Sequence, residues 1–114
     1  MPVPRHEAKA ELFRTLAHPV RVRVLELLCE REHAVHELLA AIEVEPSTLS
    51  QQLAVLRRAG IVRQRRVGGE VRYSVMIPSI DGLLAAARVT LGDLLADQAQ
   101  LQADLDDETA GTGE

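Results

Sequence analysis

The chain has 114 residues, a formal net charge of −4, 46% hydrophobic and 2% aromatic residues, and one cysteine. This length indicates one domain, and the scarcity of aromatic residues favours helix packing around aliphatic side chains. One cysteine excludes an internal disulfide, and without a signal-peptide pattern or an apolar run of about 18 residues we expect a soluble, cytoplasmic protein with no membrane partner.

The charge is unevenly distributed along the chain. Residues 46–76 carry six arginines and one glutamate, whereas residues 77–114 carry one arginine and eight acidic side chains. Residues 1–45 carry six basic and eight acidic side chains. Because the local field steers a polyanion toward a surface, the basic middle third is the candidate surface for such a partner.

Four helices are expected in the first half of the chain. Residues 5–16 have apolar side chains spaced by four, and Pro19 suits the first turn of a second helix, PVRVRVLELLCE. A short third helix is expected over about residues 34–42. Pro46 fits the first position of a fourth helix, which Gly60 ends. The third and fourth helices, joined by about four residues, form a helix-turn-helix arrangement.

The second half changes from a strand pattern to a helix pattern. Two β-branched runs over residues 61–77 flank Gly68-Gly69, a strong signal for a β-hairpin. A long helix is expected from about 79 to 105, because leucines recur there at helical spacing. We therefore expect a folded domain over residues 1–105 and an acidic, disordered tail over residues 106–114.

Three stretches together resemble the ArsR/SmtB family of dimeric bacterial transcriptional regulators. They are FRTLAHPVRVRVLELL, STLSQQLAVLRRAGIV and RRVGGEVRYSV, and the resemblance covers roughly residues 10 to 76. It implies a mainly α winged helix-turn-helix with a β-hairpin wing, in the order four helices, two strands and a last helix. It also implies a homodimer through the first and last helices.

The fourth helix would then be the recognition helix, whose N-terminal residues meet base edges in the major groove. Hydroxyl and amide side chains donate and accept hydrogen bonds there, and glutamine can bond bidentately to adenine. The bland alternative is that the hydroxyls only satisfy free N–H groups at the helix start. The candidate base-reading residues are Ser47, Thr48, Ser50, Gln51 and Gln52.

Arginines follow the recognition helix and fill the wing, where they are expected to contact phosphates and the minor groove. A solvated surface is the alternative for the wing, and Arg57 is equally suited to a structural role at the helix C-terminus. The predicted DNA-contacting arginines are Arg57, Arg58, Arg63, Arg65, Arg66 and Arg72.

These features predict a regulator that binds double-stranded DNA at an inverted repeat, because a two-fold dimer places two recognition helices about one DNA turn apart. Repression is the family's usual mode, and activation stays open. A winged-helix module for protein contact is a competing class, although such a module needs no base-reading amides. An enzyme is disfavoured, because the chain has no glycine-rich phosphate loop and no organised His–carboxylate pair.

The sequence departs from the family's metal-sensing patterns. Ala34 and His36 stand where the arsenic and cadmium sensors have cysteines, and no histidine follows His36 to build the zinc sensors' last-helix site. A site combining His33 and His36 with His6, whose N-terminal segment could cross to the partner subunit, and with Glu32 or Glu37, would suit nickel or zinc. The alternatives are surface histidines, and a metal-independent regulator controlled by a partner protein or a small molecule. The lone cysteine, Cys29, is expected to be a buried, inert thiol rather than a redox switch.

Overall fold

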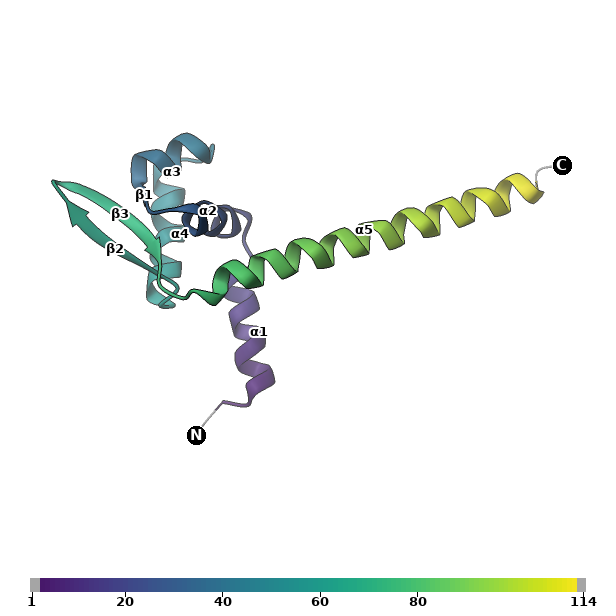
Figure 1. The fold of residues 1–114 in the computed structure, drawn as a ribbon, viewed down its shortest axis with the longest axis horizontal. Helices are drawn as coiled ribbons and strands as arrows, with labels where there is room; N and C mark the ends of the chain where they lie inside the picture. The colour runs from purple at the N-terminus through teal and green to yellow at the C-terminus, as the bar shows by residue number, and fades with distance from the viewer. Residues whose placement is uncertain (1–2, 113–114) are drawn as a thin grey trace. The chain divides into compact units, whose positions relative to one another are not determined.

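The computed structural model describes residues 3–112 and has eight elements over that range (Figure 1). It divides into two compact units, residues 1–81 and residues 82–114, so the last helix continues from the first unit into the second. No helix within the described range is long and apolar enough to cross a membrane. The elements are α1 (Arg5–Leu16), α2 (Pro19–Glu30), β1 (His33–Ala34), α3 (Val35–Ala41), α4 (Pro46–Arg58), β2 (Val62–Val67), β3 (Glu70–Val75) and α5 (Ser79–Thr112).

The predicted mainly α winged helix-turn-helix is confirmed. Helices α3 and α4 form the helix-turn-helix, and β2 and β3 form the hairpin, which projects from the helices in Figure 1. Gly68 and Gly69 have φ angles of 56° and 83°, the positive pair that a tight two-residue hairpin turn requires. Gly60, with φ of 77°, follows α4 and allows the chain to leave the helix.

A third strand joins the hairpin, which the sequence did not predict. Strand β1 pairs antiparallel with β3, so the sheet order is β1-β3-β2 with His33 opposite Tyr73 and Ala34 opposite Arg72. Two residues are too few to show the alternation by which a strand is recognised in a sequence. This short strand ties the base of the wing to the segment between α2 and α3.

The core lies where α2, α3 and α4 meet the sheet. Leucines at helical spacing fill it, because the periodic face of each helix turns inward and leaves the polar face to solvent. The inward faces of α2, α3 and α4 bury Val24, Leu27, Leu28, Leu38, Ile42, Leu49, Leu53 and Leu56, and the other buried hydrophobic residues are Leu16, Leu25, Ala34, Ile61, Val62, Tyr73 and Ile80.

Side chains fix the starts of two helices. His18, the residue before Pro19, accepts a hydrogen bond at Nδ1 from the Val20 backbone N–H at 3.1 Å and so caps the start of α2. At the start of α3, the Glu37 carboxylate accepts the Ala34 backbone N–H at 2.9 Å, and it also pairs with Arg31 at 2.8 Å. The Arg31 hydrogen bond and then the backbone N–H lower the pKa of Glu37 to about 2.

The predicted disordered tail is wrong over residues 106–112, because α5 continues through Thr112. Gln102 donates a hydrogen bond to Asp106 one turn later at 2.9 Å, and the Thr109 hydroxyl donates to the Leu105 carbonyl at 3.0 Å. Polar composition suggested disorder, but i,i+4 contacts of this kind support a solvated helix. Residues 113–114, the rest of the predicted tail, lie outside the described residues.

The lowered pKa of Glu37 predicts a pH-dependent contribution to stability. Its folded pKa of about 2 lies below the ordinary 4.5, so the contribution is present above pH 4.5 and is lost as pH falls toward 2. Glu37→Gln should therefore lower the melting temperature at pH 6, and the difference from wild type should shrink on acidification. Thermal melts followed by circular dichroism check this. Glu43→Gln, at an exposed position just after α3, is the matched control, and a constant Glu37→Gln deficit from pH 6 to pH 2 would contradict the assignment.

Candidate nucleic-acid interface

Helix α4 presents two different faces. Leu49, Leu53 and Leu56 are buried at 0%, 2% and 0% exposure, which fixes the rotation of the helix about its axis. Ser50 and Gln51 are exposed on the opposite side. The helix therefore has a buried leucine face and an exposed polar face.

The first turn of α4 has free backbone donors and hydroxyl side chains. Pro46 occupies the first helical position, and no side chain caps the helix by a hydrogen bond. Ser47 is exposed and Thr48 is half-buried, and neither acts as the cap. The structure therefore does not use these hydroxyls to cap the free N–H groups at the start of α4. The uncapped N–H groups and the positive end of the helix dipole suit an anion.

Gln52 differs from its neighbours because it faces the protein. Its Oε1 accepts a hydrogen bond from Arg21 Nε of α2 at 2.7 Å, and Arg21 Nη1 donates to the Thr15 carbonyl of α1 at 3.0 Å. The Gln52 side chain, predicted as a base reader, is thus engaged with α2 in this structure. Its spacing, three residues after Leu49 and four before Leu56, puts it on the flank of the buried face and was the available signal.

Strand register divides the four wing arginines between two faces of the sheet. Arg65 lies directly opposite Arg72, and Arg63 lies two residues before Arg65, so these three share one face. Arg66, the next residue along β2, points to the other face. All four were predicted to contact phosphate, but the sheet places three on one face and Arg66 on the other.

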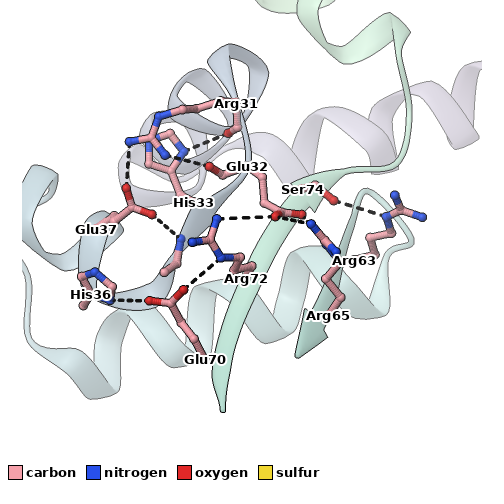
Figure 2. A network of polar contacts seen from close by, with 11 residues as sticks. Arg31, Glu32, His33, His36, Glu37, Arg63, Arg65, Glu70, Arg72 and Ser74 are labelled. Atoms are coloured by element: carbon pink, nitrogen blue, oxygen red, sulfur yellow. Dashed lines mark hydrogen bonds and ion pairs between the residues drawn. The ribbon is translucent and has the colours of Figure 1, made fainter. Parts of the chain in front are cut away.

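Two carboxylates lie among the arginines of the first face (Figure 2). Glu32 accepts hydrogen bonds from Arg65 Nε and Nη2, both at 2.8 Å, and its Oε1 lies 3.7 Å from Arg72 Nη1. Glu70 pairs with Arg72 at 2.9 Å. The hydrogen bond from Arg65 is the main reason that the pKa of Glu32 lies below its usual value, and it raises the pKa of Arg65.

The other arginines are less engaged. Arg63 Nε donates to the Ser74 hydroxyl at a long 3.3 Å. Across residues 3–112, the exposed side chains of Arg57, Arg58 and Arg66 make no ion pair. Among the six predicted DNA-contacting arginines, these four have guanidinium groups without a carboxylate partner in the described range.

The three histidines of the metal hypothesis are not brought together within one protomer. His33 is 5% exposed in β1 with Nδ1 2.9 Å from the Arg31 carbonyl, whereas His36 is exposed and lies 3.3 Å from Glu70. His6 is exposed on α1. The described residues contain no group of three His, Cys, Asp or Glu side chains placed to hold a metal ion.

Cys29 is half-buried and unpaired by any disulfide. Burial first, and then the charge of Asp81, raise the pKa of its thiol. A raised pKa disfavours the reactive thiolate, in agreement with the expected inert thiol.

Comparisons with known proteins agree with this geometry. Residues 18–64 match the family described as bacterial regulatory protein, arsR family. An uncharacterized HTH-type transcriptional regulator of Mycobacterium tuberculosis, Rv0081, is 52% identical over 103 residues, 90% of each chain. Its crystal structure superposes with a TM-score of 0.78, covering 86% of this chain and 99% of that one.

Two further relatives are named as repressors. The crystal structure of the transcriptional repressor BigR from Xylella fastidiosa has a TM-score of 0.71 at 38% identity, covering 75% of this chain and 88% of that one. The biofilm growth-associated repressor of Agrobacterium fabrum is 43% identical over 77 residues, covering 64% of this chain and 66% of that protein.

The inward position of Gln52 predicts that two adjacent glutamines differ in their effect on stability. Gln52→Ala leaves the Nε–H of the half-buried Arg21 without its acceptor and should lower the free energy of unfolding by about 1–3 kcal/mol. Gln51→Ala, the matched control at an exposed position, should change it by less than about 0.5 kcal/mol. Urea unfolding of the two variants measures this, and equal losses would show that the Arg21 contact does not hold α4.

Proposed function

This chain belongs to the arsR family of bacterial regulatory proteins, and we propose that it is a homodimeric transcriptional repressor that binds an inverted-repeat operator. The observation that carries the proposal is the outward face of α4, where Ser47, Ser50 and Gln51 are exposed while the leucines of the same helix are buried. Repression is supported by the relatives named as repressors.

Helix α4 supplies sequence reading in this proposal. Its N-terminal turn enters the major groove, where the amide of Gln51 can donate to N7 of adenine and accept from its N6 amino group in a bidentate pair. Ser47 and Ser50 lie within about one turn of Gln51 on the helix and offer hydroxyls to neighbouring base edges or phosphates. Gln52 instead holds α4 against α2 through Arg21, so that Gln51 keeps its orientation.

The arginines supply affinity rather than sequence reading. Arg57 and Arg58 at the end of α4, with Arg63 and Arg66 in the wing, present four guanidinium groups without carboxylate partners in the described range. Four phosphate contacts per protomer give about eight per dimer, and hence a slope of log affinity against log salt near −7.

Exposed apolar surfaces on α1 and α5 support the dimer. On α1, Leu12 and Phe13 are 37% and 58% exposed, and an open hollow of about 620 Å³ runs along this helix to Ala59 and Ile61. On α5, Leu91, Leu94, Leu101 and Leu105 are each more than half exposed. Their spacings of three, seven and four residues follow the heptad positions of a helix that packs against another helix.

The positions of the histidines bear on the choice between a metal signal and another signal. Because His33 is buried in the sheet and His36 faces Glu70, the three-histidine site for nickel or zinc loses its support within one protomer. This favours the alternative in which a partner protein or a small molecule controls the regulator.

Base reading and phosphate contact are separated by two alanine variants. Gln51→Ala should cost about 1–3 kcal/mol on the operator and little on random duplex. Arg66→Ala should weaken binding to both and flatten the salt slope by about one unit for each arginine removed, about two per dimer. Fluorescence anisotropy on DNA from upstream of the protein's own gene measures both. Equal effects of the two variants on both DNAs would contradict the assignment of α4 as the recognition helix.

Charged substitutions in the exposed leucine stripe of α5 should dissociate the dimer. Leu94→Glu with Leu101→Glu places two like charges on the apolar stripe, and sedimentation velocity should then show a monomer where wild type is a dimer. The control pair, Ala96→Glu with Ala103→Glu, adds the same charge at heptad positions pointing away from the stripe. Dimers that survive the leucine changes would place the interface elsewhere.

A further inference from the structure

Glu32 lies between α2 and β1, where it reaches the wing from outside the hairpin. Pairing of His33 with Tyr73 sets β1 beside β3, and the Glu32 side chain extends past Arg72 of β3 to Arg65 of β2 (Figure 2). The two bonded residues are 33 positions apart in the chain. The carboxylate is therefore held at the wing by the sheet and not by local sequence.

We propose that Glu32 is an intramolecular competitor for DNA phosphate, which withholds Arg65 from the duplex and so limits how tightly the wing binds. This inference rests on the proposed function, because it concerns how strongly the same wing engages DNA. It makes Arg65, which the sequence placed among the equivalent phosphate contacts, a reserve contact that operates only when its carboxylate partner is displaced.

The geometry of the pair is the first argument. Both Glu32 oxygens accept from the Nε and Nη2 edge of Arg65 at 2.8 Å. This edge of a guanidinium is also the one that binds a phosphate bidentately, since carboxylate and phosphate present similar pairs of oxygens. A phosphate that approaches Arg65 must therefore replace the carboxylate or accept a poorer contact at the remaining N–H groups.

The charge of the wing is the second argument. Four arginines in β2 and β3 would give the wing +4, but Glu32 and Glu70 reduce it to +2. Neither carboxylate is far from the arginines, so each also repels a phosphate at the same surface. Half of the arginine charge of the wing is thus neutralised within the protein.

The exposure of the pair is the third argument, because it makes the contact reversible. The Arg65 side chain is 58% exposed and that of Glu32 is 22% exposed, so duplex can reach the guanidinium. An ion pair at such a surface is weak and is screened by salt, unlike one in a core. Phosphate exchange at Arg65 is therefore feasible without unfolding the wing.

The test is a double-mutant cycle on Glu32 and Arg65, measured by fluorescence anisotropy over a range of salt concentrations on operator and random duplex. Glu32→Gln keeps the shape and removes the charge. It should tighten random-duplex binding by about three- to twentyfold per dimer and steepen the salt slope by about two units, one for each arginine released.

The second arm of the cycle identifies Arg65 as the group released. Arg65→Ala alone should change affinity by less than about twofold, whereas Arg65→Ala added to Glu32→Gln should abolish the gain. Glu30→Gln is the matched control, because it removes the same charge two residues away at an exposed position of α2 and should leave the slope unchanged. Glu32→Asp, which keeps the charge but shortens the side chain, should give a smaller gain in the same direction.

The outcomes separate this inference from the proposed function. If wild type binds its operator and Glu32→Gln binds equally or more weakly, Glu32 does not compete with DNA and the inference is overturned while the proposed function stands. A gain that persists in the Glu32→Gln, Arg65→Ala double variant also overturns it, as does an equal gain from Glu30→Gln. If neither wild type nor Glu32→Gln binds duplex at all, the proposed function itself is wrong.

Discussion

The packing of three α4 leucines is the constraint on which the rest of the site depends. Leu49, Leu53 and Leu56 are all but completely buried, and a helix with three anchored positions at i, i+4 and i+7 has a single rotational setting. That setting turns Ser50 and Gln51 outward. The hydrogen bond from Arg21 to Gln52 also connects α4 to α2 on the flank of the same face. Unlike an apolar contact, it is directional.

The wing shows how a sheet redistributes charge that looks uniform in sequence. Alternation along β2 separates Arg65 from Arg66, and the added strand β1 brings Glu32 to the first of these but not to the second. Paired and unpaired arginines therefore stand side by side. A basic patch counted from sequence overstates the charge available to a polyanion wherever the fold supplies carboxylates from elsewhere in the chain.

The small core and the long last helix point to association as part of the fold's stability. The core is aliphatic apart from Tyr73 and is formed by residues up to Ile80, while Val89, Leu91, Leu94, Leu95, Leu101 and Leu105 of α5 are exposed. A domain of this size obtains only modest stability from its own core. Packing the exposed apolar stripe of α5 against a second helix would bury more apolar surface and add stability. The proposed dimer interface would thus both stabilise the protein and arrange the two recognition helices with the two-fold symmetry of an operator.

The sequence by itself determined the helices, the hairpin and the leucine face of α4, because each is set by local periodicity or by residues such as Pro46 and Gly69 that act on their own backbone. Only the tertiary structure decided that β1 exists, that Gln52 faces inward, that His33 is buried and that Glu32 binds Arg65. The contacts responsible, Arg21 with Gln52 and Glu32 with Arg65, join residues 31 and 33 positions apart. Periodicity describes how a segment divides into inner and outer faces, but a partner that distant is selected by the packing of whole elements, which no local pattern contains.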